Sequence, residues 1–320
     1  MSPRKLLVTG AAGMLGSDVM RAGEHAGYEL VGLARRDLDI TDAAAVGEAF
    51  TRIRPDAAIN CAAWTDVDGA EKNRSQAYEV NARGPDSLAR AAAALRVPLL
   101  HVSTDYVFDG KPPLDSAGAP RPYVESDPTG PRSVYGKSKA VGEITVLSAS
   151  RRHTVVRSSW LFGVDGNNFV ATMLRLAGER DAVQVVTDQV GCPTWTGHLA
   201  PALLGLIERE VAGLVHLAGT GQVSWNGFAV EIFRQAEIDC AVEPASSEQM
   251  ARAAPRPAWS ALASERADVI PMPDWRDGLA GYLAARAGMR RGSRPAPTRP
   301  SRAASRADCA QNHRPGLGGR

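Results

Sequence analysis

Short apolar runs alternate with amphipathic segments through the first third of the chain. Residues 4–9 form an apolar run, and residues 17–27, which follow a glycine-rich turn, repeat apolar side chains at helical spacing. The same alternation predicts strands at 28–34, 56–63 and 98–108 and helices at 42–55 and from about 70 to 95. Repeated strand–helix units predict a doubly wound parallel sheet, in which ligands bind at the carboxyl ends of the strands.

The alternation is less regular after residue 110. Residues 111–133 are rich in Pro, Gly and Ser and predict a long surface loop. Further on, apolar spacing predicts strands at 153–163 and 213–219 and helices from about 135 and at 167–180, 198–210 and 226–236. We therefore expect an α/β fold, a Rossmann-type doubly wound parallel sheet with a small interleaved C-terminal lobe.

Composition excludes several classes of protein. The apolar content of 44% is ordinary for a globular chain, no apolar run reaches the roughly 18 residues of a membrane span, and the N-terminal apolar patch is too short for a signal peptide. The four cysteines lack metal-ligand spacing, which predicts reduced thiols and, with the other features, a cytoplasmic protein.

Charge is unevenly distributed. Residues 290–320 carry eight Arg and one Asp, so the total of +2 leaves −5 for residues 1–289, and no nucleic-acid footprint is expected there. The segment 289–320 also has almost no large apolar side chains, which predicts a disordered tail.

The turn after the first strand has the spacing of a dinucleotide-binding turn. Gly10, Gly13 and Gly16 would allow a tight turn, close approach of the backbone to a pyrophosphate, and close packing of helix on strand. An ordinary strand-to-helix turn is the alternative. We expect a dinucleotide-binding domain at 1–158 and a substrate-binding lobe at 159–288 that returns to the sheet.

A basic pair follows the second strand. Arg35 and Arg36 lie about twenty residues after the glycines, where an arginine accepts a 2′-phosphate. The pair favours NADPH, whereas Asp37 and Asp39 leave NADH possible. A charged surface turn is the alternative interpretation.

Tyr135 and Lys139 stand four residues apart at the start of a predicted helix. This spacing puts both side chains on one face, and we expect the ammonium to lie near the phenol oxygen. A nearby cation would ease ionisation of a phenol whose ordinary pKa is about 10, and reduction of a ketone needs such a proton donor. Alone, the spacing is also typical of a solvated helix.

Together with Ser103-Thr104-Asp105-Tyr106 at a strand end, these features resemble the extended short-chain dehydrogenase/reductase superfamily. The finer resemblance is to the dTDP-4-dehydrorhamnose reductase family, over about residues 4–286. It is carried, in order, by VTGAAGMLG, DLDITD, INCAAWTDVDGAE, VNARG, STDYVFDG, YVESDPTGPRSVYGKSKAVGE, RSSWLFGVDGNNFVATMLRLA, VTDQVGCPT and RPAWSAL. The resemblance implies reduction of the C4 ketone of a dTDP-linked 4-keto-6-deoxy sugar by a nicotinamide cofactor.

The resemblance also implies roles for three catalytic residues. Tyr135 would donate the proton, Lys139 would hold the cofactor ribose, and the Thr104 hydroxyl would donate to the developing alkoxide. A strand-end hydroxyl that caps its own backbone is the alternative for Thr104.

The expected binding residues fall into two sets. The cofactor set is Gly10, Ala12, Gly13, Met14, Leu15, Gly16, Arg35, Arg36, Asp39, Ile40, Ala62, Ala63, Thr65, Asn81, Tyr135 and Lys139. The substrate set is Thr104, Asp105, Trp160, Asn168, Gln189 and Arg256. The alternatives are a packed strand end for Ala62 and Ala63, a solvent-facing Asn81, a core Trp160 and a surface Arg256.

Some members of the family carry a carboxylate shortly after the Pro-Thr of the DQxGxPT motif, where it helps to bind magnesium at a dimer contact. Here Trp195, Thr196, Gly197 and His198 follow Pro193-Thr194, so we expect no such metal and either a monomer or a homodimer.

Two other functions stay open. One is reduction of a different nucleotide-linked 4-keto-6-deoxy sugar. The other is a non-catalytic dinucleotide-binding subunit, because the sequence also resembles the regulatory β-subunit of methionine adenosyltransferase. A regulator would not need to keep Thr104, Tyr135 and Lys139 together.

Overall fold

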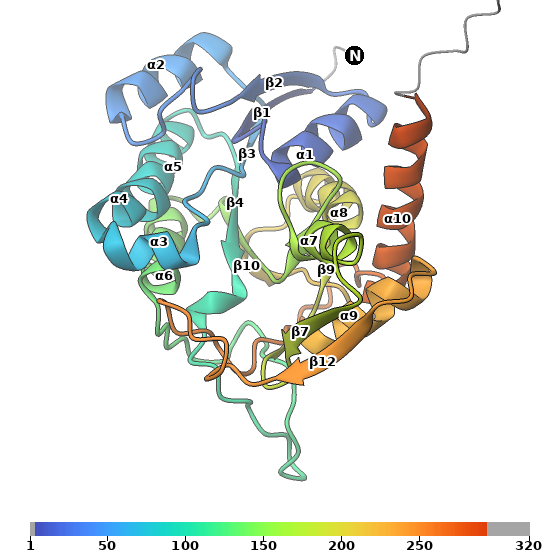
Figure 1. Cartoon of the computed structure of the whole chain (residues 1–320). Helices are drawn as coiled ribbons and strands as arrows, with labels where there is room; N and C mark the ends of the chain where they lie inside the picture. The colour runs from blue at the N-terminus through green and yellow to red at the C-terminus, as the bar shows by residue number, and fades with distance from the viewer. Residues whose placement is uncertain (1–3, 293–320) are drawn as a thin grey trace, which may run out of the picture.

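Six parallel strands form the central sheet (Figure 1). The computed structural model describes residues 4–292. The strands are β1 Lys5–Thr9, β2 Glu29–Leu33, β3 Ala57–Asn60, β4 Leu99–Thr104, β5 Thr154–Ser158 and β10 Gly213–His216. Their order is β10-β5-β4-β3-β1-β2, with every neighbouring pair parallel. The winding reverses between β1 and β3, which confirms the predicted α/β fold.

Helices cover both faces of this sheet. One face carries α1 Met14–His25 and α8 Thr196–Glu208, and the other carries α2 Ala43–Ile53, α5 Gly84–Ala94 and α6 Val134–Ala149. Successive residues of a strand point to opposite faces. Accordingly Leu6 and Val8 pack with α1 and α8, whereas Leu7 packs with the other set, and all three are fully buried.

The helix expected from about residue 70 to 95 is broken. The segment contains α3 Val67–Lys72, α4 Arg74–Tyr78, a π-helix at Glu79–Arg83 and then α5. Asn73 separates α3 from α4 because its backbone angles, φ −117° and ψ 48°, are not helical. The expectation of one continuous helix is therefore wrong, and the π-helix is of the kind that often marks a functional position.

The strand expected at 153–163 is also divided. β5 ends at Ser158, and β6 Leu161–Phe162 pairs with β9 Thr194–Trp195 outside the central sheet. Between them Trp160 has a φ of +48°, a left-handed conformation that is rare for a large side chain. This residue turns the chain out of the sheet.

A smaller lobe is built from short sheets and helices. Its elements are β7 Ala182–Val186, β8 Val190–Gly191, β11 Val223–Ser224, β12 Ala241–Ala245, α7 Phe169–Leu176, α9 Trp225–Gln235 and α10 Trp275–Gly292. Its core includes several aromatic side chains, with Phe162, Phe228 and Trp275 buried together. β10 returns from this part of the chain to the central sheet. The domain boundary at residue 158 stays a prediction.

Among the described residues, no helix has the length and apolar character to span a membrane. The predicted tail at 289–320 lies outside the described residues from 293 onward. Its first four residues, 289–292, belong to α10.

Candidate active site

Two of the expected catalytic side chains meet at the carboxyl end of β4, where α6 begins. Thr104 ends β4, and Ser133 caps α6 by accepting the Gly136 N–H at 3.1 Å. A Cβ at Gly136 would overlap the Tyr106 carbonyl oxygen, so this glycine allows the first turn of α6 to approach the strand end. The result is that the Thr104 hydroxyl lies near enough to the Tyr135 phenol to influence its pKa.

The phenol of Tyr135 is in a poorly solvated place. Burial raises the pKa of Tyr135 to about 12, while the nearby Thr104 hydroxyl opposes the rise and the charge of Asp105 adds to it. The Tyr106 ring packs edge-on against Tyr135, with centroids 5.5 Å apart. The expected lowering of the Tyr135 pKa is therefore wrong for this arrangement. The phenol is protonated at neutral pH, as a proton donor must be.

Lys139 is held by strand β4 rather than by the phenol. Its Nζ donates to the Val102 carbonyl oxygen at 2.6 Å and lies 3.2 Å from Nε2 of His101. Burial lowers the pKa of Lys139 to about 8, and the charges of Glu143 and Cys61 oppose that shift. The ammonium does not contribute to the pKa of Tyr135 because its polar end points to the strand.

A buried polar chain joins Lys139 to the glycine-rich turn. Asn60 Nδ2 lies 2.9 Å from His101 Nδ1, and Asn60 Oδ1 accepts both the Thr9 hydroxyl at 2.8 Å and the Ala62 N–H at 2.9 Å. Thr9, Asn60 and His101 are buried. Sequence reasoning missed all three. The available signal was a polar residue in or at the end of each of three largely apolar strands.

A cavity of about 280 Å³ lies where β1, β2 and β3 end. A Cβ at Gly10, whose φ is +70°, would lie 2.6 Å from the Ala62 nitrogen, and a Cβ at Gly16 would overlap the Gly10 carbonyl oxygen. The lining residues are Gly10, Ala12, Gly13, Ala34, Arg35, Leu38, Asp39, Ile40, Cys61, Ala62, Ala63, Trp64 and Val80. Backbone exposed at the start of α1 and small side chains opposite fit the adenosine and phosphates of a dinucleotide.

The remaining expected cofactor residues lie beside this cavity. Leu15 is buried within α1, and Met14 contacts the Asn168 amide through its sulfur at 3.9 Å. Arg36 is 88% exposed and lies 3.7 Å from Asp37, so Arg35 is the basic residue of the pair that faces the cavity. Thr65 is exposed.

Asn81 is not solvent-facing but holds backbone near the site, as the family resemblance implies. It is fully buried in the π-helix, its Oδ1 accepts the Trp64 N–H at 2.8 Å, and its Nδ2 donates to the Trp64 carbonyl and to the Ser138 hydroxyl. It therefore ties the segment after β3, which lines the cofactor cavity, to helix α6.

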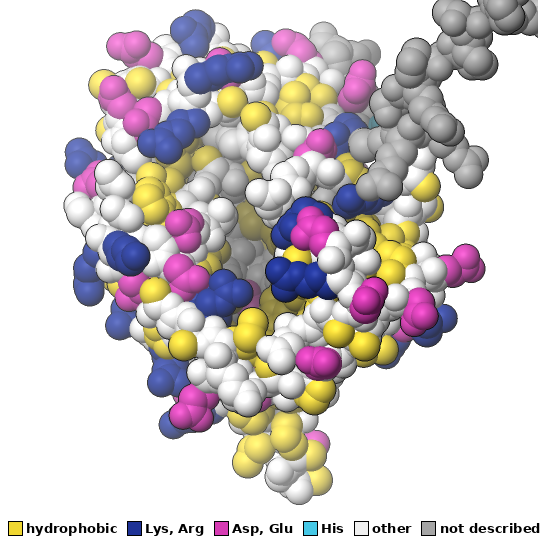
Figure 2. Space-filling model, viewed as in Figure 1, with side chains coloured by type: hydrophobic (Ala, Val, Ile, Leu, Met, Phe, Trp, Pro, Cys, Tyr) yellow, Lys and Arg dark blue, Asp and Glu magenta, His cyan; other side chains and the backbone are white. Residues whose placement is uncertain are grey.

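A second cavity, of about 350 Å³, lies between the sheet and the smaller lobe, and Figure 2 shows a hollow on this face with Lys and Arg side chains at its rim. Gln189 and Arg256 line it, as expected for substrate residues. Sequence reasoning missed the others, namely Tyr106, Phe169, Thr172, Met173, Leu176, Gln184, Val185, Val186, Trp225, Ser247, Met250 and Arg252. Tyr106 connects this cavity to Tyr135 through their ring contact.

Arg256 is not a free cation. Its guanidinium makes two hydrogen bonds of 2.8 Å to the Asp68 carboxylate, which lower the pKa of Asp68 to about 2. Arg252 lies farther from Asp68, at 3.8 Å, and its side chain is 59% exposed. Both arginines face the second cavity, but Arg252 is the more available to an anion.

Four expected substrate residues do not line this cavity, and one of them is Thr104, at the end of β4. Trp160 stacks on Trp225 at 3.5 Å, and only Trp225 reaches the cavity wall. Asn168 caps α7 by accepting the Ala171 N–H, and Asp105 is buried behind Thr104. Trp160, Asn168 and Asp105 therefore hold neighbouring residues in place and do not form the cavity wall.

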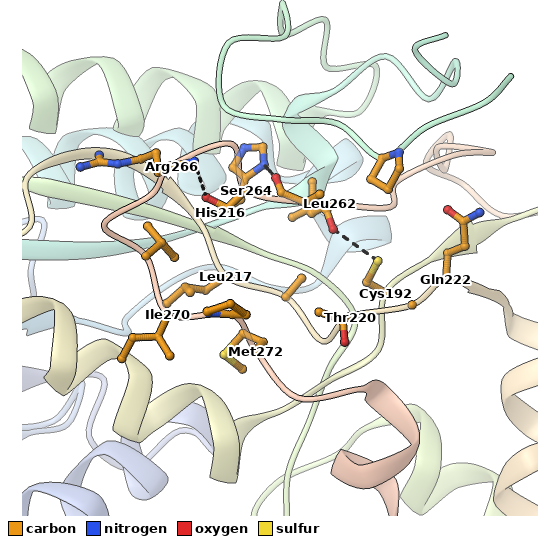
Figure 3. Close-up of a pocket in the computed structure, with 16 residues that line it drawn as sticks. Cys192, His216, Leu217, Thr220, Gln222, Leu262, Ser264, Arg266, Ile270 and Met272 are labelled. Carbon is orange, nitrogen blue, oxygen red and sulfur yellow. Dashed lines mark hydrogen bonds between the residues drawn. The ribbon is translucent and has the colours of Figure 1, made fainter. Parts of the chain in front are cut away.

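Figure 3 shows a further cavity, of about 510 Å³, at the carboxyl end of β10. His216, Leu262 and Met272 are among the residues that line it, and Cys192 contacts the Leu262 carbonyl there. It shares no lining residue with the other two cavities. In residues 4–292, no group of three or more His, Cys, Asp or Glu side chains is arranged to hold a metal ion.

Comparison with known proteins gives consistent matches. The family described as RmlD substrate binding domain matches residues 4–287. A dTDP-4-dehydrorhamnose reductase of Mycobacterium tuberculosis is 47% identical over 288 residues, which is 88% of this chain and 93% of that protein. A probable dTDP-4,6-dihydroxy-2-methyloxan-3-one 4-ketoreductase of Streptomyces antibioticus is 40% identical, over 85% of this chain and 92% of that protein.

A solved structure is also similar. The dTDP-4-dehydrorhamnose reductase of Bacillus anthracis in complex with NADP superposes with a TM-score of 0.84 at 36% identity, and the match covers 88% of this chain and 99% of that one.

The doubly wound sheet, the glycine-rich turn and the tyrosine and lysine of α6 define an extended short-chain dehydrogenase/reductase. Within that class, the chain belongs to the dTDP-4-dehydrorhamnose reductase family.

Proposed function

We propose that this chain reduces the C4 ketone of dTDP-4-dehydro-L-rhamnose to the alcohol of dTDP-L-rhamnose, with NADPH as the reductant. The single observation that carries the proposal is the position of Tyr135. Its phenol lies beside Thr104 at the end of β4, and its ring contacts Tyr106, which lines the cavity between sheet and lobe. The relatives at 47% and 36% identity have this activity in their names.

Tyr135, Thr104 and Lys139 each have a separate role in the proposed reaction. Tyr135 gives its proton to the C4 oxygen, and the Thr104 hydroxyl donates to that oxygen as negative charge develops, a contact worth about 2.7–4 kcal/mol when well placed. Lys139, one turn farther along α6, would hold the cofactor ribose, and in the structure its Nζ donates to the Val102 carbonyl oxygen. When bound, the reduced nicotinamide supplies the hydride to C4.

The cofactor is proposed to bind in the first cavity, where β1, β2 and β3 end. Gly10, Ala12 and Gly13 would accommodate the pyrophosphate, and Ile40 and Ala62 would flank the adenine, because all five line this cavity. Arg35 would accept the 2′-phosphate of NADPH, while Asp39 on the same wall leaves NADH possible.

The substrate is proposed to occupy the second cavity. The Trp225 face suits the apolar side of a deoxysugar or base, Gln189 offers an amide, and Arg252 and Arg256 offer cations to a diphosphate. The oligomeric state, monomer or homodimer, and the cytoplasmic location stay predictions.

The alternative with specific support is reduction of another nucleotide-linked 4-keto sugar, because the Streptomyces antibioticus relative is named for a different substrate. The same catalytic residues would serve it. A non-catalytic role fits less well, because the Thr104 hydroxyl and the Tyr135 phenol lie together at the end of β4, an arrangement that a regulator does not need.

A substrate panel tests the proposal. Purified protein is supplied with NADPH and each of several dTDP-linked 4-keto sugars, and NADPH absorbance is followed. We expect kcat/KM to be highest with dTDP-4-dehydro-L-rhamnose. Oxidation of NADPH with another sugar alone would support the alternative, and inertness with all of them would refute a reductase.

A further inference from the structure

The Thr104 hydroxyl already donates its single proton to Asp105. Its Oγ1 accepts the Tyr106 N–H at 3.2 Å, donates to Asp105 Oδ1 at 2.9 Å, and also faces the Tyr135 phenol. A hydroxyl carries a single proton. When Thr104 donates to Asp105, it cannot donate to the phenol oxygen or to a substrate oxygen.

The conflict disappears when Asp105 holds a proton. The carboxyl O–H then donates to Thr104 Oγ1, and the Thr104 proton turns toward Tyr135 and the ketone oxygen. Asp105 keeps its proton in this arrangement. The two changes are that Asp105 donates to Thr104 instead of accepting from it, and that the Thr104 proton points to Tyr135 and the ketone oxygen.

The surroundings of Asp105 favour the protonated form. Asp105 is 2% exposed and forms no salt bridge within residues 4–292, and its Oδ2 has no hydrogen-bond partner there. The groups that face it are neutral near pH 7. They are the phenol of Tyr106 on its own segment, Tyr135 from α6, the Cys192 thiol from the segment between β8 and β9, and the Ser260 hydroxyl.

Burial accordingly raises the pKa of Asp105 to about 6, and the nearby Ser260 and Thr104 hydroxyls only oppose the rise. Ser260 Oγ is itself buried and does not complete a hydrogen bond. A nucleotide sugar and a dinucleotide bring further negative charge to this region, which shifts the Asp105 pKa upward again.

We propose that Asp105 is a positioning residue whose carboxylic acid, in the reacting complex, donates to Thr104 and so aims the Thr104 hydroxyl at Tyr135 and the substrate oxygen. This inference rests on the proposed reductase function. It adds a positioning role to the expected substrate contact of Asp105.

The pH dependence gives the first test. Protonated Asp105 is required, so kcat/KM of the wild-type protein should fall as pH rises through about 6, by about tenfold per unit, until another ionisation intervenes. The pH profile of kcat reports the bound complex, so the same decrease with rising pH should occur at higher pH in that profile. Absence of any such limb between pH 5 and 9 in wild-type kcat and kcat/KM would overturn the proposal.

Variants separate this role from simple packing. In Asp105→Asn the amide N–H donates to Thr104 at every pH, so we expect activity near that of wild type at pH 5.5 and no falling limb. Asp105→Ala leaves Thr104 without that donor and should lose roughly 10²-fold at every pH, as should Thr104→Val, whereas Thr104→Ser should keep the limb.

Two outcomes with an active wild-type protein would overturn the inference. One is Asp105→Asn with the wild-type pH profile, and the other is Asp105→Asn as inactive as Asp105→Ala while its melting temperature and NADPH affinity are unchanged. An inactive wild-type protein would instead refute the proposed function.

Discussion

At the scale of single residues, the site depends on which polar groups are buried together. Tyr135 keeps its proton because burial raises its pKa, and Thr104 and Asp105 decide how that phenol is hydrogen-bonded. Lys139 is anchored through Val102 and His101. Each of these side chains can be altered with little change in volume, so its role can be measured separately.

Removing the phenol hydroxyl should remove the reaction and little else. We expect Tyr135→Phe to lower kcat by at least 10²-fold, the usual effect of losing a general acid, with NADPH affinity nearly unchanged. Steady-state kinetics and a fluorescence titration with NADPH measure the two effects. Tyr28→Phe is the matched control, because the Tyr28 hydroxyl contacts only Glu208 at the surface. Wild-type turnover in Tyr135→Phe would contradict the assignment.

The buried Asp105 should also affect stability. Its pKa is raised on folding, so its ionisation stabilises the unfolded chain, and stability is lost as pH rises from about 4 through about 6. Above pH 7 the cost approaches about 3 kcal/mol at 1.36 kcal/mol for each unit of pKa. Asp105→Asn should therefore unfold at higher denaturant concentration than wild type at pH 8 but not at pH 4. An equal difference at both values would contradict this account.

Residues in recognisable spacings could be predicted from the sequence. The buried polar residues that hold them in place could not. Tyr135, Lys139 and Gly10 stand in recognisable spacings. The pairing of Asn60 with His101 could not be predicted, because it depends on register between β3 and β4, which one strand alone does not reveal.

At the scale of elements, apolar periodicity was sufficient for the central sheet and most of its helices. It failed where local backbone geometry interrupts a regular pattern, at Asn73, in the π-helix and at the left-handed Trp160. It also missed β12, which contains Pro244 and is mostly exposed, and α10. Apolar spacing carries little information about such positions.

The approach of α6 to β4 should depend on Gly136. Gly136→Ala places a Cβ against the Tyr106 carbonyl, so we expect a loss of about 1–3 kcal/mol in the free energy of unfolding and a lower kcat. The control is Gly47→Ala in α2, where a Cβ meets nothing within 4 Å, and stability should rise by roughly 0.5–1 kcal/mol. Urea unfolding measures both. A neutral Gly136→Ala would contradict the close contact.

At the scale of the whole molecule, the site lies between two parts of the chain. Asp68 of α3 is joined to Arg256 across the second cavity, and Tyr106 and Trp225 contribute to its walls from the sheet and the lobe. The sequence indicated that these parts interleave. It could not indicate that Arg256 would be paired and Arg252 exposed, because that depends on how the lobe packs on α3.

Loss of an arginine from the second cavity should weaken substrate binding and leave turnover nearly unchanged. Arg252→Ala should raise KM for the nucleotide sugar by about tenfold or more, since a hydrogen bond to a charged group is worth about 1.5–3 kcal/mol, while kcat stays within about twofold. Arg90→Ala, on the exposed surface of α5, is the control. Steady-state kinetics at saturating NADPH measure both, and an unchanged KM would place the diphosphate elsewhere.

The central claim is that hydride passes to C4 of the sugar in the cleft where Tyr135 and Thr104 meet. The most direct measurement uses NADPH carrying deuterium at nicotinamide C4, together with dTDP-4-dehydro-L-rhamnose, and locates the label by NMR. The account predicts one deuterium at C4 of dTDP-L-rhamnose when the transferred hydrogen is the labelled one, and no product with Tyr135→Phe on the same timescale. Label at another carbon, or no consumption of NADPH by the wild-type protein, would contradict it.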